Sequence, residues 1–210
     1  MSRTGLFDSH AHMDSDYFTD DRDVLLTQLQ EELDGIINPG CDEITSGFAV
    51  SLAEKYDFMY AAVGWHPEDL EGILDNSYLD GLAAWAVHPK VVAIGEIGLD
   101  YYWKGNEPKD VQKRRLLEQL DLAKQFDLPV IIHDRDAHGD ILEIFQKEVT
   151  GVRAVFHCYS GSLEMAKELL KRGFYLGFGG TSTYKMPQKC ARSCSMCRMT
   201  CCCLKQIHLI

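Results

Sequence analysis

The stretch VVAIGEIGLDYY, residues 91–102, contains the pattern that decides the fold. Its residues are apolar and partly β-branched with almost no polar interruption, which is typical of a parallel strand buried on both faces. One carboxylate, Glu96, interrupts this run. A buried carboxylate needs a cation or several hydrogen bonds. The stretch therefore predicts a buried strand that carries either a functional group or a salt-bridged residue of the core.

Similar apolar runs occur on both sides of this strand, and amphipathic stretches separate them. Seven predicted strands lie within residues 4–13, 35–41, 58–67, 90–102, 128–134, 152–160 and 174–180. Six predicted helices lie within residues 23–35, 43–56, 78–88, 109–127, 140–149 and 162–173. This alternation predicts βαβ units with a parallel sheet.

Two architectures fit this alternation, an open doubly wound sheet and a (β/α)₈ barrel. No GxGxxG motif follows the first strand, which weakens the dinucleotide-binding version of the open sheet. Nearly every predicted strand ends in His, Asp, Glu or Asn, and in a barrel these ends converge on one mouth. We therefore expect a TIM-type (β/α)₈ barrel. It is expected to be incomplete, with about seven βα units and the eighth strand missing.

The composition is that of an ordinary single-domain protein. The chain has 210 residues, 46% of them apolar and 25% charged. The sequence has no apolar run long enough to span a membrane and no signal-peptide pattern, so a cytoplasmic protein is expected. The formal net charge of −11 argues against a general nucleic-acid binder. Residues 185–210 contain five Lys or Arg and no Asp or Glu, so the net charge of residues 1–184 is more negative than that of the whole chain.

Two histidines near the N-terminus indicate a metal site. His10 and His12 are two residues apart in a predicted strand, so both side chains should point to the same face. Paired imidazoles that share a divalent cation avoid mutual repulsion. His133 ends VIIH and His157 ends AVFH, each closing a β-branched run like that before Glu96. Any one of these histidines alone fits a surface or core position, but together they favour a metal centre.

The motifs FDSHAH, GWHPE, GEIGLDYY, VIIHDRDA and FHCYSGS, in this order, resemble those of the TatD family of metal-dependent deoxyribonucleases. The resemblance covers about residues 6–184. It implies a TIM-type barrel with a two-metal hydrolytic site in the domain 1–184. It also implies that His10, His12 and Glu96 hold one ion, while Glu96, His133 and His157 hold the other. Glu96 is thus the catalytic residue that both ions share, and the ions are expected to be Mg, Mn or Zn.

The resemblance further implies cleavage of phosphodiester bonds in DNA, at single strands or 3′ ends. Some relatives hydrolyse other esters, including that of D-aminoacyl-tRNA. His66 and Arg135 are the expected phosphate contacts, although His66 also fits a structural role before Pro67 and Arg135 a pairing with Asp134 or Asp136. Tyr101 and Tyr102 could stack on a base or serve as packing. The sequence leaves the oligomeric state open.

The last residues differ from the rest of the chain. Six of the eight cysteines lie between Cys190 and Cys203, so residues 185–210 are expected to form an aberrant Cys-rich tail and not a domain. The family pattern ends its eighth strand in an LLETD-like motif whose Asp binds the first metal, and no such motif is present. Read from the third base of each codon, MTCCCLKQIHL (199–209) can encode DMLLLETDSP. We therefore infer that the reading frame slipped between about residues 184 and 190.

Three hypotheses follow from these observations. The first is a TatD-like hydrolase whose activity is impaired by loss of the C-terminal Asp. The second is a catalytically inactive metal-binding remnant. The third is a zinc or iron–sulfur protein that uses the tail, because Cys190, Cys194 and Cys197 have the CxxxCxxC spacing. A disulfide-linked tail would need an oxidising compartment.

Overall fold

A computed structural model describes residues 6–179 and 202–204, and its strands form one parallel sheet. The strands follow one another in chain order from β1 to β8, so each pairs with its neighbour in sequence. Their bounds are β1 Phe7–Asp8, β2 Gly35–Pro39, β3 Met59–Val63, β4 Val91–Asp100, β5 Val130–Arg135, β6 Ala154–Phe156, β7 Tyr175–Phe178 and β8 Cys202–Leu204. All seven pairings are parallel, as the βαβ alternation predicts.

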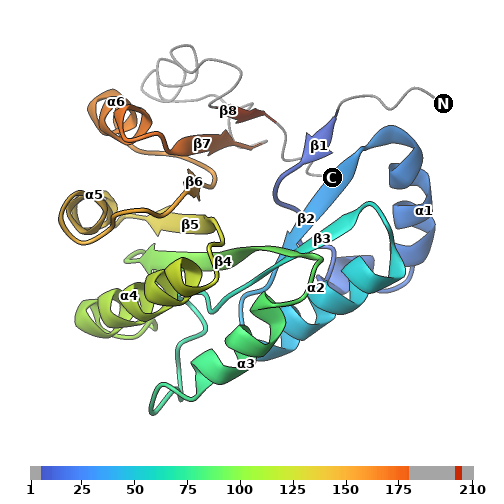
Figure 1. Cartoon of the computed structure of the whole chain (residues 1–210), viewed down its shortest axis with the longest axis horizontal. Helices are drawn as coiled ribbons and strands as arrows, with labels where there is room; N and C mark the ends of the chain where they lie inside the picture. Colours follow the sequence, from blue (N-terminus) through green and yellow to red (C-terminus); the bar gives the residue numbers. More distant parts are fainter. Residues whose placement is uncertain (1–5, 180–201, 205–210) are drawn as a thin grey trace.

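The helices lie outside the curled sheet, so the strands occupy the centre of the molecule (Figure 1). Their bounds are α1 Arg22–Glu32, α2 Glu43–Lys55, α3 Tyr78–Ala86, α4 Lys109–Gln125, α5 His138–Lys147 and α6 Leu163–Lys171, with a 3₁₀ turn, η1, at Asp16–Phe18. Among the described residues β8 and β1 are not paired with each other. The expected incomplete (β/α)₈ barrel is therefore confirmed, and the open doubly wound sheet is not observed.

A short segment occupies the eighth strand position. Cys202–Leu204 pairs in parallel with Leu176–Phe178 of β7, but this strand has only three residues, so the barrel is incomplete as expected. An edge strand presents unpaired N–H and C=O groups, and these can pair with any extended segment whatever its side chains. The remainder of the expected tail, 185–201 and 205–210, lies outside the described residues.

Two apolar layers hold the barrel together. The smaller layer is made of small or β-branched side chains, one from each of five adjacent strands: Ile37, Ala62, Ala93, Ile131 and Val155. The larger layer lies between strands and helices and includes fully buried leucines and isoleucines. Removing such apolar area from water supplies the main driving force for folding. The smaller layer leaves the ends of the strands free to carry polar groups.

An irregularity in β4 turns Glu96 toward the interior. Ile94 and Ile97 both belong to the layer between strands and helices, although they are three residues apart. Strict alternation would place Glu96 on the same outer side as Ile94. The register between β4 and β5 shifts between Ile94 and Ile97. Three steps along β4 match two steps along β5, so β4 contains one extra residue here. The bulge thus places a carboxylate in the barrel, a frequent use of bulges beside active sites.

No helix within the described residues is both long and apolar enough to cross a lipid bilayer.

Candidate metal centre

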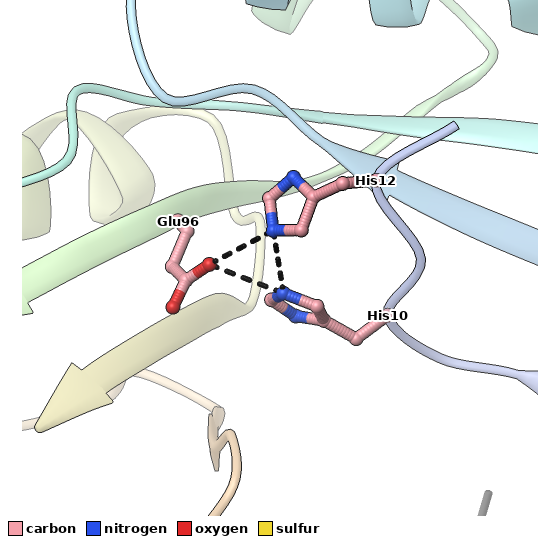
Figure 2. Close-up of side chains that lie close together, drawn as sticks. All are labelled: His10, His12 and Glu96. Carbon is pink, nitrogen blue, oxygen red and sulfur yellow. Dashed lines mark hydrogen bonds and ion pairs between the residues drawn. The ribbon is translucent and has the colours of Figure 1, made fainter. Parts of the chain in front are cut away.

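Glu96 lies at the centre of a group of histidines near the carboxyl ends of the strands. Its side chain is buried, and its two oxygens face different partners. Oε2 lies 3.1 Å from Nε2 of His10 and 3.5 Å from Nε2 of His12. Figure 2 shows both imidazoles pointing at this oxygen from the segment after β1. The two Nε2 atoms are only 3.1 Å apart.

The other oxygen of Glu96 faces three further histidines. Oε1 lies 3.0 Å from Nδ1 of His133, 3.9 Å from Nε2 of His157 and 3.9 Å from Nε2 of His66. The rings of His10 and His157 stack with centroids 3.5 Å apart, which joins the two groups. Five histidines from distant parts of the sequence therefore meet around one carboxylate.

His10 and His12 do not lie on a strand, contrary to the expectation, because β1 ends at Asp8. The side chains of His10 and His12 still point to the same side, for a reason other than a strand. The N–H of Ala11 donates to the C=O of Ile37 in β2, so the chain stays extended beyond the strand. The N–H of His10 also donates to the carboxylate of Asp8 at 3.0 Å. An extended backbone places residues two apart on the same side.

The other site residues come from the ends of their strands. His133 lies within β5. His157 directly follows β6, and His66 is the third residue after β3. The N–H of His157 donates to the C=O of Ile132, which continues the pairing with β5 beyond the assigned strand. The strand ends therefore converge as in other barrels of this type.

Asp100 is a site residue that the sequence reasoning missed. It is fully buried at the end of β4, and its Oδ2 lies 2.9 Å from Nε2 of His133. Its Oδ1 accepts hydrogen bonds from the N–H groups of Tyr102 and Trp103. His133 is thus held between two carboxylates, Glu96 on one side of the ring and Asp100 on the other. The strand-final Asp in GLDYY was the signal that could have found it.

Arg135 lies beside the aromatic residues that follow β4. Its guanidinium carbon is 3.9 Å from the ring centroid of Tyr102 and 5.6 Å from that of Trp103. Among the described residues it forms no ion pair, so the pairing with Asp134 or Asp136 is not observed. The hydroxyl of Tyr101 donates a hydrogen bond to Asp140. The exposed Trp103 is a second residue that the sequence reasoning missed.

Burial and close charges shift the pKa values of these groups. Burial alone would raise the pKa of Glu96, but the nearby imidazoles of His10 and His157 bring it well below its usual range. Burial opposes protonation of His12 and His133, yet their carboxylate partners raise the pKa of His12 to about 10 and that of His133 to about 9. Burial lowers the pKa of His66 to about 4 and that of His157 to about 3. The ionised Glu96 is thus surrounded by both charged and neutral imidazoles.

The donor atoms fit divalent cations. The ligand atoms of His10, His12 and Glu96 lie within 4.8 Å of one another, as do those of His66, Glu96 and His133, and of Glu68, Asp100 and His133. Imidazole nitrogen with carboxylate oxygen is the donor set of zinc, manganese and iron sites in proteins. Burial and a hydrogen bond with Asp100 raise the pKa of Glu68, which lies at the exposed rim.

The comparisons with known proteins identify the family. The family model described as TatD related DNase matches residues 7–201, which is most of the chain. The chain belongs to the TatD family. The match runs past residue 184, into the segment that the motifs alone did not cover.

Several TatD-family proteins resemble the chain closely. It is 43% identical over 186 residues to the metal-dependent hydrolase YabD of Bacillus subtilis, covering 88% of this chain and 72% of that protein. It is 33% identical to the 3′-5′ ssDNA/RNA exonuclease TatD of Citrobacter koseri, covering 83% and 67%. The crystal structure of Escherichia coli YjjV superposes with a TM-score of 0.84 at 32% identity, covering 94% and 76%. The chain is thus a member of a family of metal-dependent hydrolases.

Proposed function

We propose that the chain is a two-metal phosphodiesterase that removes nucleotides from the 3′ end of single-stranded DNA, with an activity impaired by loss of the C-terminal Asp of the family pattern. The observation that supports this proposal is that the two carboxylate oxygens of Glu96 face different histidines. Its Oε2 faces His10 and His12, whereas its Oε1 faces His133, His157 and His66. Of these three, the family resemblance assigns His133 and His157 as ligands. A carboxylate whose two oxygens address separate sets of nitrogen donors is suited to bridge two cations.

The ligand assignment follows these two sides. His10 and His12 would hold one ion with Oε2 of Glu96, and His133 and His157 would hold the other with Oε1. When bound, two such cations lower the pKa of a shared water and neutralise charge that develops on phosphate oxygens. Glu96 would help to hold both ions, and its burial would keep bulk water from weakening their charges.

The hydrogen bonding of His66 supports a role in binding the substrate. The N–H of Glu68 donates to Nδ1 of His66 at 3.2 Å, so this nitrogen is an acceptor. Because burial lowers the pKa of His66 to about 4, the ring is neutral and carries its proton on Nε2. This Nε2–H points toward Glu96, into the centre of the site. A neutral donor in this position is suited to an anionic oxygen of a phosphate group.

The position of Arg135 is compatible with the same substrate. It lies two residues after His133 on β5, so both side chains leave the strand on the same face. The guanidinium has no carboxylate partner among the described residues and can pair with a phosphate or a base.

The names of relatives favour nucleic acid as the substrate. The Citrobacter koseri relative is named as an exonuclease of single-stranded DNA and RNA, whereas YabD and YjjV are named only as metal-dependent hydrolases. Bound cations also reduce the objection that the chain is acidic, because they supply the local positive charge. DNA is therefore the substrate class of the proposal, with the ester of D-aminoacyl-tRNA as the alternative to be tested.

A metal titration and a nuclease assay together test the proposal. Calorimetry with Mn²⁺ should give two ions per chain, and DNA labelled at its 5′ end should shorten one nucleotide at a time from the 3′ end. The variant Glu96→Gln should lose both ions and the activity. Glu54→Gln, which changes an exposed carboxylate, should behave like the unchanged protein.

Four outcomes contradict parts of the proposal. Binding of one ion, or of two ions by Glu96→Gln, would mean that Glu96 does not bridge. Binding of two ions with no cleavage of DNA or of a D-aminoacyl-tRNA ester would identify an inactive metal-binding remnant. Cleavage of the ester alone would reassign the substrate.

A further inference from the structure

Two half-exposed aromatic side chains follow β4 beside the metal centre. Tyr102 and Trp103 are 51% and 52% exposed. Their rings meet edge to face with centroids 5.1 Å apart. The guanidinium of Arg135 lies against the Tyr102 ring. We refer to Tyr102, Trp103 and Arg135 as the aromatic platform.

The aromatic platform is fixed relative to the metal centre. Asp100 accepts hydrogen bonds from the N–H groups of Tyr102 and Trp103 at 2.9 and 3.2 Å. The other oxygen of the same carboxylate contacts His133. Arg135 follows His133 by two residues on β5, and its C=O accepts from the N–H of Tyr101 at 2.9 Å. One buried carboxylate and one strand therefore tie the backbone that carries the exposed rings to a proposed metal ligand.

Positive charge accompanies these rings, although the chain as a whole carries a net charge of −11. Arg135 forms no ion pair with another described residue. Lys104 follows Trp103 and is exposed. The ammonium of Lys109 lies 4.1 Å from the ring centroid of Tyr101. Aromatic rings together with basic side chains are the combination that binds single-stranded nucleic acid, through base stacking and contacts to phosphates.

We propose that the aromatic platform binds the unpaired bases of a single-stranded nucleic acid next to the phosphate that is cleaved. This inference rests on the proposed function. The ring faces accept any base, so the platform binds without sequence preference. Bases in a duplex are already stacked on their neighbours and cannot use it. The platform therefore selects single strands over duplexes.

The test measures binding without turnover. The full chain with Mg²⁺ is titrated with fluorescent oligothymidylate whose phosphorothioate linkages resist cleavage with this ion, and anisotropy gives the dissociation constant. Trp103→Ala and Tyr102→Ala should each weaken binding about 5- to 100-fold, the range of base–aromatic stacking. Trp103→Phe keeps an aromatic face and should retain most of the affinity. Circular dichroism confirms that each variant is folded.

Tyr175→Ala is the matched control. Tyr175 is 44% exposed and is the first residue of β7, at the end of the sheet opposite to the metal centre. It should bind the oligonucleotide like the unchanged protein. A duplex of the same length should bind weakly, and its affinity should be the same in Trp103→Ala.

The results separate this inference from the proposed function. If the unchanged protein cleaves and binds single strands, and Trp103→Ala and Tyr102→Ala bind as tightly, the platform inference is wrong and the proposed function stands. If the aromatic variants instead lose duplex binding and single-strand binding equally, the inference that stacking selects single strands over duplexes is wrong. If the unchanged protein neither binds nor cleaves nucleic acid, both proposals fail.

Discussion

The Nε2 atom of His133 lies 2.9 Å from Oδ2 of Asp100, on the side of the ring opposite to Glu96. An acceptor at Nε2 keeps a proton on that nitrogen and leaves Nδ1 available as a metal ligand. Asp100 therefore selects the tautomer that the proposed metal centre requires. It does so from a position with no exposed surface.

The variant Asp100→Asn should disturb this tautomer. Oδ1 accepts from two backbone N–H groups, so the amide oxygen should take that place and turn the NH₂ group toward His133. His133 would then accept at Nε2 and carry its proton on Nδ1. We expect metal affinity to fall about 10- to 100-fold, the usual effect of changing such a partner. Calorimetry measures it, and Asp110→Asn, at an exposed site in α4, is the control. Unchanged affinity in Asp100→Asn would refute the tautomer argument.

A substitution at His66 should separate substrate binding from metal binding. His66→Leu removes the donor and should lower kcat/KM about 10- to 100-fold, the contribution of a hydrogen bond to a charged group. His66→Gln keeps an N–H donor and should recover part of the loss. Both variants should still bind two Mn²⁺ ions in calorimetry. A lower metal stoichiometry in both would show instead that His66 is a ligand.

Gly98→Ala should weaken the join between β4 and β5. Gly98 pairs with His133, and a Cβ at this position would lie 2.0 Å from the backbone oxygen of His133. The strands must move apart to accept it, so the free energy of unfolding should fall by about 1–3 kcal/mol, as in other overpacked sites. Urea unfolding measures the change. Gly105→Ala, with no heavy atom within 4 Å, should leave stability nearly unchanged, and equal losses would contradict the steric explanation.

Metal removal should lower the melting temperature. A ligand that binds only the folded chain adds about 2.7 kcal/mol at one hundred times its Kd. For a chain of this size each 1 kcal/mol changes the melting temperature by about 2–4 °C. We therefore expect EDTA to lower it by roughly 5–10 °C and excess Mn²⁺ to restore it. In Glu96→Gln neither addition should have an effect, and a full response in that variant would place the ions elsewhere.

The inferred slip of the reading frame gives a further prediction. A gene that restores the hidden frame after residue 184 would supply the strand and Asp of the family pattern. General-base assistance contributes typically about 10²–10⁴-fold to rate, so the restored protein should cleave single-stranded DNA faster by about that factor. Rates on a labelled oligonucleotide measure it, at equal concentrations of the two folded proteins. Equal rates would mean that the absent Asp is not needed.

The sequence predicted the barrel and the convergence of the histidines because both depend on local patterns. Continuous apolar runs that end in polar residues define parallel strands and their carboxyl ends. The inward position of Glu96 depends on a register shift between β4 and β5, which no periodicity along one strand reveals. The contact of Asp100 with His133 and the short strand β8 are also relations between strands. Patterns along one segment therefore did not reveal them.

The stacking of His10 on His157 has a mechanical consequence. One ring follows β1 and the other follows β6, so more than half of the chain lies between them. Cations held through Glu96 would tie these two points together, in a sheet whose first and eighth strands are not paired with each other within the described part of the chain. A cross-link that closes so long a loop restricts the unfolded chain strongly, as a disulfide does. The ions would then act as a reversible cross-link between β1 and β6, which stabilises a barrel whose described strands do not close.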